Sequence, residues 1–220
     1  NWASGEPNDS APSPLPSEDF IELWDASFSG QFWNDAHPDD HPRGYVVEFD
    51  NSGSTAFCFG DGSGAPCPCA NNSTAGHPGG CGNSAGNGAV LTSTGSPSVA
   101  MDTLNLDLAS ASPNSFALLV SGLNQLPQTG GCIGCGLIAF DGLRCAGGGF
   151  LRHGSRATDT MGETGNGWGP PGGPPGGLIA ANGFAAGQTR NFFAFYRDNP
   201  GFVCMTGQNS SNGISITFAP

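Results

Sequence analysis

The chain has 220 residues, and its 18 acidic and 6 basic residues give a formal net charge of −12 at pH 7. All the basic residues are arginine, since the sequence contains no lysine. Such a charge repels nucleic acid and anionic lipid, which excludes both as partners. No apolar run approaches the length of a membrane span, and the chain length suits one large β domain or one domain with a fragment.

Oxygen-donor side chains are concentrated in the first fifty residues. A hard cation such as calcium requires oxygen ligands of this kind. Pro7 stiffens the backbone between two of the donors, and in the cis form it would point both neighbouring side chains one way. The segment therefore predicts a calcium site, built from Glu6, Asn8, Glu18, Asn34 and Asp35.

The order of these residues resembles the C-terminal half of a C-type lectin domain, where a Glu-Pro-Asn loop, a later Glu and a Trp-Asn-Asp strand build a calcium site. The resemblance implies that the five donors bind calcium, that Glu6, Asn8 and Asn34 also hold a mannose-type sugar, and that Trp33 packs in the core. The chain departs from the family because Phe20 and Val47 stand where its cysteines sit, and the segment 10–17 is longer than usual. A half domain cannot bury a core of its own, so we expect a longer precursor or a partner that completes it.

The histidines give no enzyme motif. None of the four lies in a nucleophile or metalloprotease motif. The segment 37–41, His-Pro-Asp-Asp-His, groups metal-ligand types, but its two prolines and its polarity favour a solvated loop. The segment 60–64 resembles a calcium loop, but it lacks the repeated carboxylates and favours a turn. We therefore expect a protein that is not an enzyme.

The eight cysteines predict an oxidising compartment. They are Cys58, Cys67, Cys69, Cys81, Cys132, Cys135, Cys145 and Cys204. Paired cysteines also hold zinc, but Cys67-Pro-Cys69 is one residue short of the usual knuckle, so disulfides are the favoured interpretation. Connectivity does not follow from spacing. The disulfides that we expect are a pairing within 58–81, a small 132–135 loop and a long 145–204 bridge.

The composition changes after residue 50, where a polar joint at 51–56 leads into a glycine-rich region at 57–220. Strict alternation at 104–108 predicts a half-buried strand, and the continuous apolar run at 116–120 predicts a strand covered on both faces. Further strands are expected at 89–92, 137–140, 191–196 and 214–218. Many short strands with Gly- and Pro-rich turns indicate a mainly β fold, with an antiparallel sandwich or jelly roll after the lectin-like half domain.

The second region also carries a resemblance. Phe-Cys-Phe-Gly-Asp-Gly-Ser-Gly at 57–64, Cys67-Pro-Cys69, Asp-Gly-Leu-Arg-Cys at 141–145, Thr189-Arg190, Phe-Tyr-Arg-Asp at 195–198 and Asn-Ser-Ser-Asn-Gly at 209–213 are the motifs concerned. They resemble an uncharacterised cysteine-stapled domain of large secreted bacterial proteins, often found after lectin-like or adhesive modules. The resemblance implies an extracellular location and brings no catalytic residue.

Three further sequence features bear on the surface of the protein. Trp168 lies in a polar Gly- and Pro-rich loop, which predicts an anchor for an interface. The proline-rich segment that follows, 169–177, lacks the collagen repeat and favours an extended loop. In an exported chain, Asn-x-Ser/Thr sequons mark candidate glycan acceptors, here Asn8, Asn71, Asn72 and Asn209.

These features support an extracellular, non-enzymatic structural or adhesive protein that assembles with copies of itself into a surface layer or filament. The strand expected at 214–218 offers a sheet edge for such pairing, and a head-to-tail contact generates a fibre. The alternative is a calcium-dependent lectin module for mannose-type glycans. A second alternative is an accessory domain of a secreted hydrolase.

Overall fold

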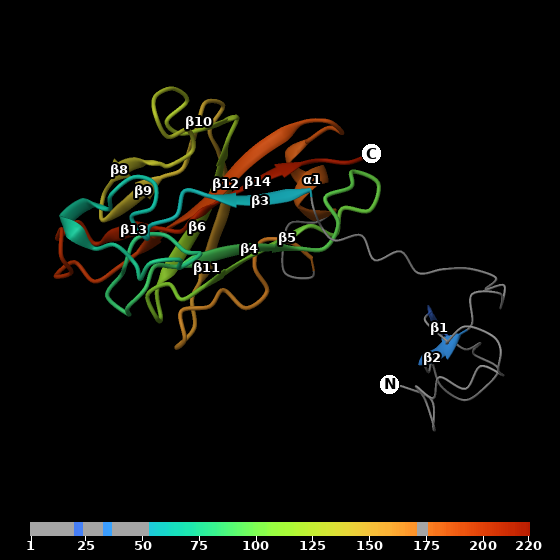
Figure 1. Cartoon of the computed structure of the whole chain (residues 1–220), viewed down its shortest axis with the longest axis horizontal. Helices are drawn as coiled ribbons and strands as arrows, with labels where there is room; N and C mark the ends of the chain where they lie inside the picture. The colour runs from blue at the N-terminus through green and yellow to red at the C-terminus, as the bar shows by residue number, and fades with distance from the viewer. Residues whose placement is uncertain (1–19, 24–32, 37–52, 171–175) are drawn as a thin grey trace, which may run out of the picture. The chain divides into compact units, whose positions relative to one another are not determined.

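The computed structural model describes residues 53–170 and 176–220, together with two short strands near the N-terminus (Figure 1). The chain divides into two compact units, residues 1–50 and 51–220. In the first unit, β1 (Phe20–Leu23) pairs antiparallel with β2 (Trp33–Ala36).

One antiparallel sheet forms the frame of the second unit. Its strands lie in the order β11 (Leu151–Ala157), β6 (Phe116–Gly122), β12 (Thr189–Arg197), β14 (Gly213–Thr217) and β3 (Ser54–Phe57). β13 (Gln208–Ser210) pairs with the second half of β12. β12 lies at the centre because its aromatic residues fill both faces of the sheet, as a fully covered strand requires.

Alternate side chains of this sheet enter two separate cores, because successive residues of a strand point to opposite faces. Phe192, on β12, belongs to the larger core, and Ile214 lies opposite it on β14. Phe193 belongs to the smaller core, and Val120 lies opposite it on β6. The register of β6 and β12 thus determines which residues meet on each face.

The larger core is closed by a hairpin of β4 (Val90–Thr94) and β5 (Asn105–Ala109) and by α1 (Gly177–Asn182). Leu106 and Leu108 of the hairpin are fully buried, as the alternation predicted. Trp168 is also completely buried there, and its Nε1 donates to the carbonyl oxygen of Gly154 at 2.8 Å. The prediction that Trp168 is an interface anchor is therefore wrong.

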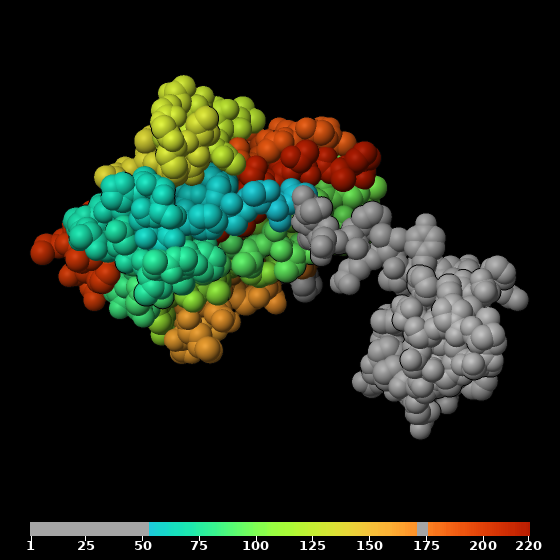
Figure 2. All heavy atoms as spheres, in the orientation of Figure 1, coloured from blue at the N-terminus to red at the C-terminus, as the bar shows by residue number. Residues whose placement is uncertain are grey.

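The smaller core lies on the opposite face, under short elements and disulfides. It is covered by the pair β8 (Leu137–Ala139) and β9 (Gly142–Arg144), by the pair β7 (Asn124–Gln125) and β10 (Ala146–Gly147), and by the 3-10 turn η1 (Pro68–Ala70) with its flanks. The segment that follows β7, yellow in Figure 2, stands out from the body of this unit.

The structure confirms a mainly β, antiparallel fold and all six expected strands. Residues 54–56, assigned above to a polar joint, are part of β3, and α1 was not expected. The expectation of a free terminal strand is wrong, because β14 pairs with β12 on one side and with β3 on the other. Among the described helices, none has the length and apolarity needed to cross a membrane.

Candidate interaction surface

The cysteines form four disulfides, which join Cys58 to Cys145, Cys67 to Cys81, Cys69 to Cys204 and Cys132 to Cys135. The small 132–135 loop and a pairing within 58–81 are confirmed. The 145–204 bridge is wrong, because Cys145 follows β9 in the smaller core beside Cys58, whereas Cys204 lies in the loop between β12 and β13. The bridges tie the segment after β3 to two distant parts of the chain.

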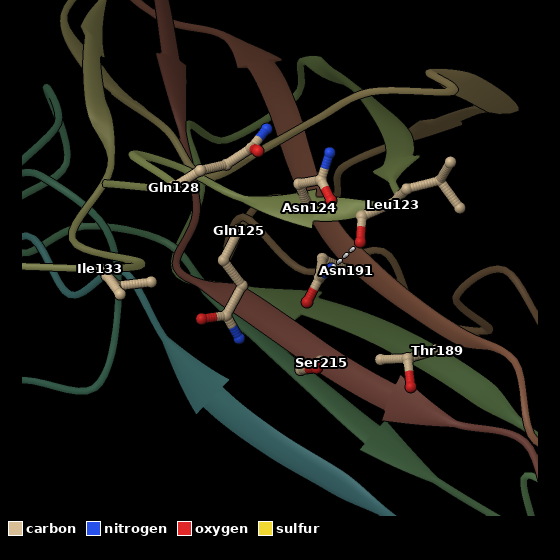
Figure 3. A pocket seen from close by; sticks show the side chains of 8 residues that line it. All are labelled: Leu123, Asn124, Gln125, Gln128, Ile133, Thr189, Asn191 and Ser215. Atoms are coloured by element: carbon tan, nitrogen blue, oxygen red, sulfur yellow. Dashed lines mark hydrogen bonds between the residues drawn. The ribbon is translucent and has the colours of Figure 1, made fainter.

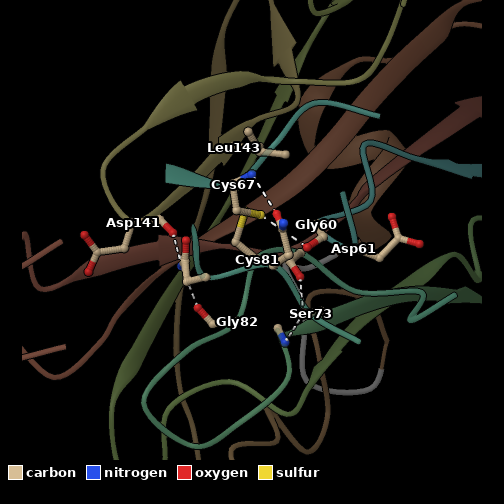
Figure 4. Close-up of a disulfide and its surroundings, with 12 residues drawn as sticks. Gly60, Asp61, Cys67, Ser73, Cys81, Gly82, Asp141 and Leu143 are labelled. Atoms are coloured by element: carbon tan, nitrogen blue, oxygen red, sulfur yellow. Dashed lines mark hydrogen bonds between the residues drawn. A yellow bond between two sulfur atoms is a disulfide. The ribbon is translucent and has the colours of Figure 1, made fainter. Parts of the chain in front are cut away.

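The Cys67–Cys81 bridge lies in a region where backbones approach closely (Figure 4). The nitrogen of Ser73 donates to the carbonyl oxygen of Gly60 at 2.8 Å, and its hydroxyl donates to that of Gly80 at 2.8 Å. A side chain on Gly60 would meet the backbone of Gly80 at 2.1 Å, so only glycine fits there. The segment is therefore held by backbone contacts as well as by sulfur.

Two of the candidate glycan acceptors lie inside this region. Asn71 Nδ2 donates to the carbonyl oxygens of Gly82 and Asp141, at 2.9 and 2.8 Å, and Asn209 Nδ2 donates to that of Gly82 at 2.9 Å. Both side chains are buried, so neither nitrogen is open to a glycan in this fold. Asn72 is exposed and stays a candidate, whereas Asn8 lies outside the described residues.

The predicted calcium ligands fall in the first unit. Glu6, Asn8 and Glu18 lie outside the described residues, as does the segment 37–41. Asn34 and Asp35 are in β2, opposite Glu22 and Ile21 of β1. Where the structure describes side chains, no three His, Cys, Asp or Glu residues form a group that could hold a metal.

The segment 60–64 is a turn in the structure, as its composition favoured. The carboxylate of Asp61 accepts hydrogen bonds from the nitrogens of Ser63 and Gly76, at 2.9 and 3.0 Å. Hydrogen bonds from Ser63 hold the pKa of Asp61 below its ordinary value. This carboxylate closes a turn.

Ser121, His153 and Asn182 form a hydrogen-bonded series across three elements. Ser121 Oγ lies 2.8 Å from His153 Nε2, and His153 Nδ1 lies 3.0 Å from Asn182 Oδ1. This is the order of nucleophile, base and orienting group in serine hydrolases. However, Ser121 is completely buried, and the rings of Phe184 and Phe192 lie 5.9 and 5.4 Å from the imidazole. The series therefore joins β6, β11 and α1 against the larger core, and burial closes the hydroxyl of Ser121 to a substrate.

Phenylalanine rings form a row on the sheet face that carries the smaller core. The ring centroids are 6.5 Å apart from Phe150 to Phe193, 4.8 Å from Phe193 to Phe195 and 5.9 Å from Phe195 to Phe140. All three contacts have the edge-to-face geometry that aromatic pairs prefer. Phe193 is buried, but Phe140 and Phe150, at the two ends, are 46% and 37% exposed. The row is therefore buried in its middle part and reaches the surface at both ends.

The exposed part of this row continues onto β6. Leu118 lies opposite Phe195 in the sheet register and is partly buried. Phe116 points to the same face two residues earlier and is 60% exposed, which corrects the prediction of a strand covered along its whole length. We call this surface the aromatic face; it consists of Phe116, Leu118, Phe140, Phe150 and Phe195.

Arginines border the aromatic face. The guanidinium carbon of Arg144 lies 5.3 Å from the ring centroid of Phe150, within cation–π range. Arg152 lies opposite Val120, and Arg197 follows Phe195 by two residues, so strand alternation places both on this face, and both are exposed. Exposed aromatic residues with arginine are the composition that distinguishes protein interfaces from other surfaces.

Comparison with models of protein families, with curated proteins and with solved structures found no match for the chain. The assignment of the aromatic face as a candidate interaction surface therefore rests on the geometry of this structure alone. The sequence carried a signal for part of it, since Phe193, Phe195 and Arg197 alternate along one strand. The sequence carried no such signal for Phe140 and Phe150, because only the tertiary structure brings them to the same sheet face.

Proposed function

We propose that the chain is an extracellular, non-enzymatic structural or adhesive protein, and that the aromatic face joins it to further copies of itself. The observation that carries the proposal is the exposure of Phe116 and Phe140 on the sheet face that also carries Arg152 and Arg197. Exposed aromatic side chains that lie together on one face mark interaction sites. The four disulfides suit an oxidising compartment outside the cell.

Charge favours a second copy as the occupant of the aromatic face. The chain carries a net charge of −12, and all but one of its arginines lie in the second unit. Two aromatic faces that met each other would bring like charges together, which is unfavourable. The bordering arginines instead suit an acidic surface elsewhere on another copy. Such a contact joins two different surfaces, so it does not close on itself and extends into a filament.

Sedimentation velocity with negative-stain microscopy tests this contact. The wild-type protein is expected to form assemblies at low salt that dissociate at about 0.5 M NaCl, because the arginine contacts are screened. The double change Phe116→Ser with Phe140→Ser and the double change Arg152→Glu with Arg197→Glu should each give monomers. Met101→Ser is the control, since Met101 is 65% exposed in the loop between β4 and β5. A monomeric wild type, or assemblies that survive both double changes, would refute the proposal.

A second candidate function is calcium-dependent binding of mannose-type glycans by the first unit. It is supported by the pairing of β1 with β2, in which Asn34 and Asp35 are adjacent strand residues after Trp33, the arrangement that the C-type lectin resemblance implies. An adhesive filament would use both functions. The two are separable, because one depends on calcium ligands in the first unit and the other on the aromatic face.

A further inference from the structure

A shallow hollow of about 370 Å³ lies on the same side of the main sheet as the smaller core (Figure 3). Its floor is formed by Thr189 and Asn191 of β12 and by Ser215 of β14. In register, Asn191 lies opposite Ser215, so their side chains share the sheet face. β7 and the segment that follows it border the hollow, which is separate from the aromatic face.

The hollow is lined by uncharged polar groups. The hollow contains four carboxamides, those of Asn124, Gln125, Gln128 and Asn191. It also contains the hydroxyls of Thr189 and Ser215. Leu123 and Ile133 supply aliphatic surface. None of the lining side chains is ionisable, so an anionic ligand meets no cation there and a cationic ligand meets no carboxylate. The chemistry selects a neutral ligand that both donates and accepts hydrogen bonds.

Asn191 provides an independent indication of a ligand. The residue is 3% exposed, and its Nδ2 donates to the carbonyl oxygen of Leu123 at 3.0 Å. Its Oδ1 is buried without a hydrogen-bond partner. Figure 3 shows this oxygen on the side of the residue away from the bond to Leu123, in the part of the hollow where Gln125 lies. Buried acceptors nearly always have a hydrogen-bond partner. The missing partner of Asn191 Oδ1 is a donor, and a bound ligand would supply it.

The other amides are available for a ligand. Within the part of the chain that the structure describes, the side-chain amides of Asn124, Gln125 and Gln128 make no hydrogen bond. Each amide offers two donors and one acceptor oxygen. Gln128 and Ile133 are exposed at the rim, where Ile133 presents an aliphatic surface that is 66% exposed.

The segment that carries the rim is fixed in place before any ligand binds. The disulfide between Cys132 and Cys135 closes the short loop around Ile133. The nitrogen of Gly136 donates to the carbonyl oxygen of Leu126 at 2.6 Å, which holds the end of this loop against the segment after β7. A rim that is ordered in the free protein loses less entropy on binding.

We propose that this hollow binds one or two units of a neutral saccharide. Sugar hydroxyls donate to Asn191 Oδ1 and exchange hydrogen bonds with the amides of Gln125 and Gln128, while the C–H face of the ring contacts Ile133. The volume lies near the lower end of ligand pockets, which span about 300–1,000 Å³. The site uses none of the predicted calcium ligands, so its binding does not depend on a metal. It is also separate from the contact between copies proposed above.

Calorimetric titration of the whole chain in the presence of EDTA tests the site, with glucose, mannose, galactose and N-acetylglucosamine as probes. At least one is expected to bind with a Kd of about 1–10 mM, the range of a few hydrogen bonds to one sugar ring. Gln128→Ala and Ile133→Ala should each weaken binding by about fivefold or more. Both residues lie at the exposed rim, so the fold is retained. Glucuronate, which adds a charge, should bind no more tightly than glucose.

Gln208→Ala is the matched control, because Gln208 is also an exposed glutamine, lies on β13 and does not line the hollow. This change should leave sugar binding unaltered. Failure of all four sugars to bind would overturn the proposal, and so would binding that neither rim change weakens. Sugar binding that appears only with calcium would assign recognition to the first unit and likewise overturn it. The state of assembly does not enter these outcomes, so they are independent of the proposed contact between copies.

Discussion

Oγ of Ser121 in β6 lies 2.8 Å from Nε2 of His153 in β11, whose imidazole packs against two rings of the larger core. Burial is the main cause that lowers the pKa of His153 to about 4, and the charge of Arg190 lowers it further, while the hydrogen bond with Asn182 acts in the opposite direction. The ring is therefore neutral at pH 7. Its protonation would place a charge among the rings of Phe184 and Phe192.

This pKa predicts a loss of stability in mild acid. The histidine of the unfolded chain titrates near 6.5, so below that pH the unfolded state binds a proton that the folded state does not. The contribution is present above 6.5 and is lost as the pH falls toward 4. The free energy of unfolding should decrease by on the order of 3 kcal/mol over this window, which urea unfolding at a series of pH values measures.

His153→Gln is the control for that assignment, because glutamine keeps hydrogen-bonding groups but does not titrate. The variant is less stable at neutral pH, so the slope against pH is the quantity to compare. Its slope between 6.5 and 4 should be flatter than that of the wild type. Equal slopes in the two proteins would assign the acid sensitivity to other groups.

Trp168 is expected to be among the most sensitive positions of the larger core. Trp168→Ala should lower the free energy of unfolding by about 3–5 kcal/mol, because it removes a fully buried ring and leaves a cavity. Trp168→Phe should lower the free energy of unfolding by less, because an aromatic ring still fills the core. Part of that smaller loss comes from the missing hydrogen bond to Gly154. Urea unfolding measures both. Met101→Ala, at an exposed site, should be nearly neutral; a small effect of Trp168→Ala would contradict the core assignment.

The disulfides should contribute unequally, in line with the lengths of the loops that they close. Cys58 and Cys145 are 87 residues apart, whereas Cys132 and Cys135 are 3 apart. Replacing the first pair by alanine should cost about 4–5 kcal/mol and replacing the second about 2 kcal/mol, by the loop-entropy relation. Thermal unfolding of the two double variants gives the comparison. Mass spectrometry of the digested, unreduced protein checks the pairing, and a peptide linking Cys145 to Cys204 would refute it.

The calcium ligands of the first unit remain a prediction with a direct test. Millimolar calcium should raise the melting temperature of the first unit's transition, since extracellular calcium sites have dissociation constants of about 10⁻⁴–10⁻³ M. Asn34→Ala with Asp35→Ala should abolish the rise. Magnesium at equal concentration is the control, because it demands a stricter octahedral geometry. A rise that persists in the double variant would exclude these two residues as ligands.

The sequence by itself determined the local elements of the second unit. The alternation of Leu104, Leu106 and Leu108 and the aromatic run in 191–196 predicted strands because side-chain periodicity is a property of neighbouring residues. The turn at 60–64 followed in the same way, from glycines beside Asp61. The even number of cysteines correctly indicated disulfides.

Only the tertiary structure decided which of these elements meet. Cys58 pairs with Cys145, and Trp168 enters a core rather than an interface. Phe116 is exposed at the surface although it belongs to the continuous apolar run 116–120. The unpaired oxygen of Asn191 is likewise a consequence of which strands and loops surround it. Each of these outcomes depends on contacts between segments far apart in the chain, and local spacing does not encode such contacts.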